Sequence, residues 1–225
     1  MVDREGVSRW RWGAWLWVAS SVLVLGQLVA AAAWPDGYSL ARNAISDLGV
    51  TACGEFSEGG AQARPVCSPW HAVFNGSMVL TGVLTALGAA GLWGHWPGAT
   101  GRLAMVLMGV AGMCMVAVGL APWDVRPELH DIAALGTALA QWGAMLLLLV
   151  TTRGWVRVFT AAALIVSVVG FVAFLAALDG AEVAALPFGV AERLGFDTLT
   201  LWTVVMGGVV LGSVRRPVAH TPLRA

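Results

Sequence analysis

Apolar stretches of membrane-spanning length alternate with short polar segments along almost the whole chain. A helix needs about 20 apolar residues to cross about 30 Å of hydrocarbon. The pattern predicts an all-α fold: a polytopic membrane protein whose six transmembrane helices form one compact bundle, with residues 1–225 as a single domain. The six stretches lie at about residues 13–34, 72–94, 101–121, 129–150, 157–178 and 194–214.

The composition supports this class. With 58% hydrophobic and 12% charged residues, the chain is too apolar for a soluble domain and predicts a multi-pass protein of the cell membrane. The first apolar stretch ends on Ala31-Ala32-Ala33 and so imitates a secretory signal. It is long for a signal, so we interpret it as a retained helix.

The arginines predict the orientation. All 13 basic residues are arginines, of which nine flank one face of the bundle and four the other. The face with nine is cytoplasmic under the positive-inside rule. Because the number of spans is even, both termini are predicted inside, with a cytoplasmic tail at 215–225. The nine are Arg4, Arg9, Arg11, Arg102, Arg153, Arg157, Arg215, Arg216 and Arg224.

The long connection at 35–70 is then predicted outside, and it has two unlike parts. Residues 39–50 place apolar side chains on one side and the i, i+4 pair Asn43 and Asp47 on another, which predicts a short amphipathic helix. Residues 53–69 are rich in Gly, Glu and Ser and predict an exposed loop.

Two of the three cysteines, Cys53 and Cys67, share this outer loop, whereas Cys114 lies within the third span. A disulfide between the first two would stabilise the fold by roughly 3 kcal/mol in the chain-entropy model. The alternative is two free thiols in a flexible loop. We favour the disulfide because an outer compartment permits it.

Strongly polar residues gather at the outer end of the predicted spans. Ionisable groups near hydrocarbon are costly unless paired or hydrated, so a one-sided cluster predicts a functional site. The second, fourth and sixth helices follow Pro69, Pro127 and Pro187, and their N-termini would face one vestibule that suits an anionic or carbonyl-bearing headgroup. The cluster contains Asn43, Ser46, Asp47, His71, Asn75, Asp124, His130, Asp131, Glu192, Arg193 and Asp197.

Three of these residues are candidate catalytic groups. Asp47 and Glu192 lie beside apolar sequence and are candidate acids. His130 is a candidate base, with a partner among Asp47, Asp124 and Glu192. The predicted substrate-binding residues are Asn43, His71, Asn75, Asp124, Arg193, Trp70 and Trp123.

Structural alternatives stand beside these roles. The same residues could cap helices, and Arg193 with Asp197 could form an i, i+4 salt bridge at the membrane interface. His71 and His130 with a carboxylate could bind a metal ion, but no histidine spacing of a zinc fold is present. We therefore predict no metal and no cofactor.

Several of these segments together resemble the bacterial and archaeal membrane family named domain of unknown function 998. The match spans most of the chain in order. The stretches that carry it are Tyr38-Ser39, Asn43-Ala44-Ile45-Ser46-Asp47-Leu48-Gly49, Ser68-Pro69, Phe74-Asn75-Gly76, Val118-Gly119 with Pro122 and His130, and Gly189 with Glu192-Arg193.

A further likeness, of architecture only, is to the small membrane-bound terpene cyclases, which combine a compact helical bundle with buried acids and many aromatic rings. Aromatic faces stabilise a desolvated cation by up to about 2 kcal/mol each. Core packing explains the same rings without a ligand. The rings outside the expected cytoplasmic belt are Trp70, Phe74, Trp123, Trp142, Phe196 and Trp202.

These observations lead to a hypothesis of function. We expect a membrane-embedded enzyme that performs acid–base chemistry on a lipid or isoprenoid, in a pocket of the outer half. The alternative is a transporter or lipid-binding protein without catalysis, for which broken helices or polar groups at mid-membrane would be typical. The expected partners are the bilayer and such a small molecule, not nucleic acid, and the sequence specifies no oligomeric state.

Overall fold

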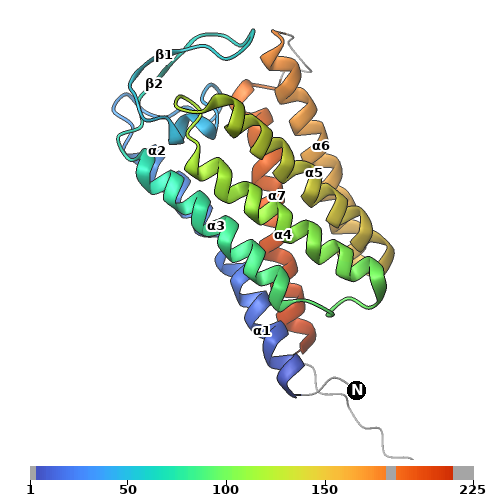
Figure 1. Ribbon diagram of the computed structural model, residues 1–225. Coiled ribbons are helices and arrows are strands. Elements are labelled where there is room, and N and C mark those ends of the chain that lie inside the picture. Colours follow the sequence, from blue (N-terminus) through green and yellow to red (C-terminus); the bar gives the residue numbers. More distant parts are fainter. Residues whose placement is uncertain (1–3, 181–185, 215–225) are drawn as a thin grey trace, which may run out of the picture.

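A computed structural model describes residues 4–180 and 186–214. Its helices run along one bundle, with a small β-hairpin across one end, which we call the hairpin end (Figure 1). The predicted tail at 215–225 lies outside the described residues. The elements are α1 Arg4–Ala19, α2 Val22–Ala32, a 3₁₀ turn Ser46–Gly49, β1 Gly54–Phe56, β2 Arg64–Val66, α3 His71–Gly91, α4 Gly98–Leu120, α5 Pro127–Thr151, α6 Gly154–Leu178 and α7 Phe188–Val214.

Six helical segments of the described chain are long and apolar enough to cross a membrane. This confirms the predicted six-helix, multi-pass architecture. Neighbouring spans pack in a closed ring in which α1 contacts both α3 and α7. Glycines allow close approach, since a Cβ on Gly82 of α3 would lie 2.5 Å from the carbonyl oxygen of Gly112 of α4.

The first span is interrupted where α1 meets α2. Around Ser20 and Ser21 the backbone N–H groups bond three residues back, as in a 3₁₀ helix. The Ser20 hydroxyl donates to the Trp17 carbonyl at 2.6 Å, and the Thr81 hydroxyl of α3 donates to the Ser20 carbonyl at 3.2 Å. Side-chain hydroxyls thus satisfy backbone groups where the regular ladder stops.

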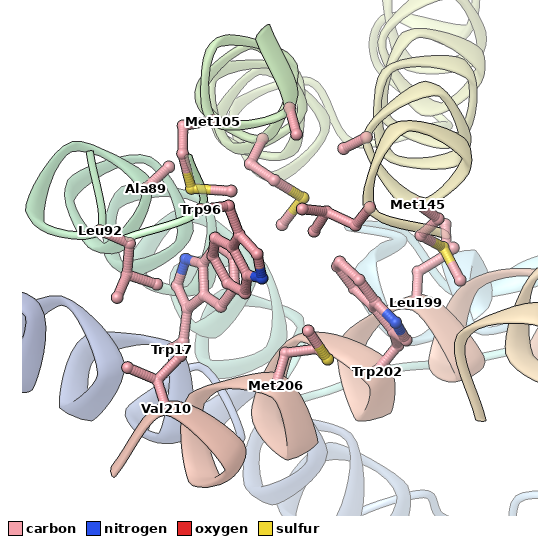
Figure 2. Packing of buried hydrophobic residues seen from close by; sticks show 14 of the residues in the cluster. Trp17, Ala89, Leu92, Trp96, Met105, Met145, Leu199, Trp202, Met206 and Val210 are labelled. Carbon is pink, nitrogen blue, oxygen red and sulfur yellow. The ribbon is translucent and has the colours of Figure 1, made fainter. Parts of the chain in front are cut away.

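The core away from the hairpin end is built on tryptophans and methionines from several spans (Figure 2). The rings of Trp17 and Trp96 are stacked with centroids 6.2 Å apart, and Trp202 lies 6.3 Å from Trp17. The Trp202 indole N–H donates to the Thr160 hydroxyl at 3.1 Å, which links α7 to α6. These rings pack the bundle, and none of the three lines the cavity described below.

The connection at 35–70 differs from its prediction in both parts. Only Ser46–Gly49 is helical, as a 3₁₀ turn, so the amphipathic helix predicted at 39–50 is wrong. A regular helix does not form because side chains compete for the backbone N–H groups. Asn43 Oδ1 accepts from the Ser39 N–H, and Asp47 Oδ2 accepts from the Ala44 N–H. The Ala44 N–H, which a regular helix would bond to the Leu40 carbonyl, is therefore already taken.

The predicted loop at 53–69 is instead an antiparallel hairpin in which Glu55 faces Pro65. Its two strands are the only ones in the described part of the chain. A disulfide joins Cys53 to Cys67 just outside the strands, with Cα atoms 4.2 Å apart. Near its tip, the Gly60 N–H donates to the Leu178 carbonyl at the end of α6, so the hairpin reaches across the bundle.

The arginine bias predicts that this hairpin lies outside the cell. After mild reduction, a membrane-impermeant thiol reagent is expected to label Cys53 and Cys67 in intact cells, because Cys53 is exposed in the structure. A Cys53→Ser/Cys67→Ser variant gives the background from Cys114. Labelling that appears only after cell lysis would reverse the orientation.

Candidate functional site

The 3₁₀ turn at the hairpin end is organised by a buried carboxylate. Asp47 is 1% exposed, and its Oδ2 accepts from the Ala44 N–H at 2.9 Å and from the Asn43 amide at 3.2 Å. Arg64 of β2 adds two bonds of 2.7 Å, one to each carboxylate oxygen. All of this carboxylate's accepting positions face the protein, so Asp47 is placed to position the turn rather than to act on a substrate.

Arg64, which sequence analysis did not single out, completes a buried charge cluster. Its guanidinium lies 3.5 Å from Glu58 and 4.6 Å from the centre of the Phe188 ring on α7. Burial lowers the pKa of Arg64, but the hydrogen bonds to Asp47 and the charges of Asp47, Glu58 and Glu192 together outweigh burial, so the pKa is raised and the group stays charged. Burial also raises the pKa of Glu58 to about 7, although Arg64 opposes this rise.

A cavity of about 60 Å³ lies directly below this turn, between the spans. It has room for a few water molecules or one small polar group. Most of its wall is apolar, and α6 contributes no lining residue. The lining comes from Ser20, Leu23, Ile45, Ser46, Phe74, Asn75, Met78, Thr81, Thr85, Met115, Val118, His130, Ala134, Thr137, Gln141, Glu192, Phe196, Leu199, Thr200 and Thr203.

Glu192 connects the cavity to the turn. It lies in the first turns of α7, is 6% exposed and lines the cavity. Its Oε2 accepts a short hydrogen bond from the Ile45 N–H, next along the chain from the N–H that Asp47 accepts. The two predicted acids are therefore neighbours, but only Glu192 reaches the cavity.

His130 lines the same cavity from α5. Its Nδ1 is 2.9 Å from the Ala121 carbonyl oxygen. A carbonyl can only accept, so Nδ1 carries the proton and Nε2 is the nitrogen that can take up another. No carboxylate orients this ring in the described structure: the predicted partners Asp47, Asp124 and Glu192 all make other bonds.

The two asparagines have different places. Asn75 lines the cavity, and its amide donates to the Gly49 carbonyl at 2.9 Å. Asn43 is buried behind the turn and bonds Asp47 and the Pro65 carbonyl. Of the two predicted donors to substrate oxygen, only Asn75 therefore borders the space that a substrate would occupy.

Arg193 holds backbone rather than a headgroup. Its Nη1 donates to the carbonyls of Asn43 at 2.9 Å and Gly189 at 2.7 Å, and its Nη2 donates to the Tyr38 hydroxyl. The salt bridge considered with Asp197 is absent from the described residues, since Asp197 accepts from Gln27 at 2.7 Å. Arg193 thus ties residues 38–43 to α7.

The remaining predicted site residues lie outside the cavity. Asp124 accepts from the Thr51 hydroxyl at 2.7 Å and from two backbone N–H groups, which anchors the chain after the turn. His71 is 2.9 Å from the Ser68 carbonyl. Trp70 is 52% exposed, and Trp123 packs edge-on against Phe56 of the hairpin.

Sequence analysis missed a polar lining deeper in the cavity, at the middle of three spans. The Gln141 amide of α5 donates to the Leu199 carbonyl at 2.7 Å and to the Thr203 hydroxyl of α7 at 2.9 Å. The sequence did carry a signal for this lining, because in each helix the two polar residues are three or four positions apart and therefore share a face. They are Thr81 and Thr85 in α3, Thr137 and Gln141 in α5, and Thr200 and Thr203 in α7.

The residues that could bind a metal are dispersed. Within 4–180 and 186–214, no three His, Cys, Asp or Glu side chains are grouped as ligands, so His71 and His130 do not share such a site. The groups available for chemistry in the cavity are therefore a carboxyl, an imidazole, amides and hydroxyls.

Comparison with known proteins gives a family but no activity. Neither the search of curated proteins nor that of solved structures found a match. The comparisons therefore lend no support to the likeness to terpene cyclases. A family model described as a protein of unknown function, DUF998, matches residues 18–209, which include the four middle spans, the turn and parts of the first and last spans. The chain therefore belongs to the DUF998 family of proteins of unknown function.

Proposed function

We propose that this protein is a membrane-embedded enzyme that performs acid–base chemistry on a lipid or isoprenoid. One observation carries the proposal: Glu192 of α7 and His130 of α5 border the same small, mostly apolar cavity between the spans. An acid and a base on separate rigid helices, with apolar space between them, suit proton transfer to and from a bound molecule.

The bonds that each group makes define its role. Glu192 uses one oxygen to hold the Ile45 N–H, and its carboxyl can deliver a proton into the cavity. His130 keeps its Nδ1 proton on the Ala121 carbonyl and takes up the substrate's proton at Nε2. A proton given at one position and removed at another leaves an isomerised or cyclised substrate, and the proton returns from His130 to Glu192 to restore both groups.

The wall suggests which part of a substrate lies where. Leu23, Phe74, Met78, Met115 and Phe196 offer apolar surface for a hydrocarbon chain. None of the four tryptophans considered for carbocation stabilisation lines the cavity. Isoprenoid chemistry therefore rests on Phe74 and Phe196 alone. A cavity of about 60 Å³ admits only the reacting end of a lipid or isoprenoid, so the rest of the chain would lie outside it.

Filling the cavity tests the proposal. Ala134→Phe is expected to lower conversion by roughly tenfold or more, because the ring occupies space that the substrate needs. Purified protein in nanodiscs would be incubated with membrane-lipid and isoprenoid fractions, and products followed by mass spectrometry. Leu135→Phe is the matched control, since Leu135 is the next residue and is 43% exposed on the outer surface of the bundle.

Two outcomes would contradict the enzyme proposal. If the unmodified protein retains a lipid without converting it, the protein is a binding protein or transporter. If Ala134→Phe and Leu135→Phe convert substrate equally, the reaction does not occur in this cavity.

The binding or transport alternative also has specific support. The first span is interrupted at Ser20, which borders the cavity, and polar side chains lie at mid-span in α3, α5 and α7. Broken helices and midplane polar groups are features of transporter sites. Movement of a radiolabelled lipid across proteoliposomes would distinguish transport from conversion.

A further inference from the structure

Gln141 gives the deep end of the cavity a fixed hydrogen-bonding direction. Its side chain is 2% exposed, and its amide nitrogen donates to the Leu199 carbonyl at 2.7 Å and to the Thr203 hydroxyl at 2.9 Å. Because a carbonyl can only accept, the nitrogen must face Leu199, and these two bonds use both amide protons. The Gln141 oxygen has no partner among the described residues. It can therefore only accept a hydrogen bond, from a group inside the cavity that Gln141 lines.

The hydroxyls around this amide share the same direction. Those of Thr81, Thr137 and Thr203 donate to backbone carbonyls at 3.2, 3.0 and 3.0 Å, so what they still offer the cavity is lone pairs. The hydroxyls of Thr85 and Thr200 can donate or accept. No lysine or arginine lines the cavity, so the anionic headgroup expected in the vestibule has no cationic partner here. The mid-span wall therefore favours an uncharged ligand that donates hydrogen bonds.

The cavity has the length and the volume of a short file of water. His130 and Gln141 in its wall are eleven residues apart on α5, which is about 16 Å along the helix axis. A volume of about 60 Å³ holds about four to six water molecules. At a spacing of about 2.8 Å they cover most of that length. One turn beyond the deep end, Met145 and Met206 are fully buried, so the file ends inside the bundle.

We propose that a file of water occupies this cavity and supplies the second substrate, so that the enzyme adds water across a carbon–carbon double bond of its lipid or isoprenoid. The inference rests on the proposed function, since it keeps Glu192 as the acid and His130 as the base. The reacting carbons lie beside these two groups, at the hairpin end of the cavity, and water fills the space between them and Gln141.

Gln141 sets the direction of the hydrogen bonds in the file. The deepest water donates to the Gln141 oxygen, and each further water donates to the one beneath it. The water nearest the reacting carbons therefore keeps its lone pairs for them. Its second proton points to His130 Nε2, which accepts because Nδ1 carries the ring proton. Gln141 is thus a positioning residue that orients the nucleophile without touching the substrate.

The atoms and protons of the hydration balance. Glu192 gives its proton to one carbon of the double bond, the water oxygen forms a bond to the other carbon, and that water loses a proton to His130 Nε2. The proton then returns from His130 to Glu192. If no water were present, the same protonated substrate would lose a proton to His130 and leave as an isomer. Reactive intermediates escape water only in sites that exclude it, so a file of water directs the reaction to an alcohol.

Conversion in ¹⁸O-labelled water tests the reaction. Purified full chain in nanodiscs would be incubated with membrane-lipid and isoprenoid fractions, and the products weighed by mass spectrometry. The product is expected to be heavier than its substrate by one labelled water. A product of unchanged mass would overturn the addition of water and leave the proposed acid–base enzyme standing. No conversion at all would overturn both.

Gln141→Leu tests the positioning role, because leucine has a similar volume and no acceptor. The ratio of hydrated to isomerised product is expected to fall by about tenfold or more. Gln27→Leu is the matched control, since Gln27 is an amide in another span that bonds Asp197 outside the cavity. A loss that lowers both products of Gln141→Leu in proportion would show a structural role only and overturn the positioning of water.

Radiolytic footprinting tests for the water without any substrate. X-ray pulses split water into hydroxyl radicals, which oxidise the side chains beside it. Met115 lines the cavity, whereas Met108 on the same helix is packed in the core away from the cavity. Met115 of the unmodified protein is expected to be oxidised several times faster than Met108. Equal oxidation of the two would show a dry cavity and overturn the inference, whatever the protein converts.

Discussion

Replacing Arg64 by methionine is expected to destabilise the protein by about 3–5 kcal/mol, the usual effect of removing one partner of a buried ion pair. Asp47 and Arg64 are 1% and 5% exposed, so neither charge can turn to water when its partner is lost. The change also removes the cation beside Glu58 and the contact with Phe188. Unfolding in mixed detergent micelles, followed by circular dichroism, would measure the loss.

A double-mutant cycle separates the ion pair from other effects. Asp47→Asn keeps an acceptor for the Ala44 N–H but removes the charge that Arg64 meets. The double variant Asp47→Asn/Arg64→Met is therefore expected to lose less stability than the two single variants added together. Arg42→Met, at an exposed position of the same connection, serves as the control. Strict additivity would show that the pair contributes nothing as a pair.

Glu192→Gln is expected to lower turnover by roughly 10² or more while leaving the fold and ligand retention intact. The amide keeps an oxygen to accept the Ile45 N–H, so the turn stays attached to α7. It cannot deliver a proton, which is the step that the proposed chemistry needs. Conversion and retention of the substrate would be measured on the same purified samples.

Asp197→Asn is the matched control for this change. Asp197 lies on the same helix, is half-buried and bonds Gln27 outside the cavity. Turnover by the Asp197→Asn variant is expected to stay within about twofold of that of the unmodified protein, because this side chain does not contact the substrate. Equal turnover of Glu192→Gln and the unmodified protein would remove Glu192 from the acid role. Loss of folding in Glu192→Gln would make it a structural residue.

The spans were predictable because length and hydrophobicity alone decide which segments cross a bilayer. The break at Ser20 was not, because it depends on a hydroxyl from Thr81, 61 residues away. The same dependence on a residue distant in sequence explains why the ion pair of Asp47 was not predicted. Its neighbours Ile45 and Leu48 suggested an isolated buried acid, but Arg64 reaches it through a hairpin whose register the loop composition did not show.

Only some of the residues predicted for the site line the cavity near the hairpin end. Glu192, His130 and Asn75 line the cavity, whereas Arg193 and Asp124 bind backbone, because carbonyl and N–H groups of an irregular connection need partners. The threonines and Gln141 were overlooked since each is uncharged. Their shared helical faces, not their polarity, carried the information.

The position of Arg64 outside the spans affects how the chain is inserted into the membrane. An arginine at the centre of a membrane-spanning helix costs about 2.5–3.5 kcal/mol at insertion. Here the buried guanidinium is carried by a hairpin outside the six spans, closed by the Cys53–Cys67 disulfide, so the spans enter the bilayer without it. The charge of Arg64 can therefore join the helices from the aqueous side after the spans have inserted, so that burying this arginine places no demand on membrane insertion.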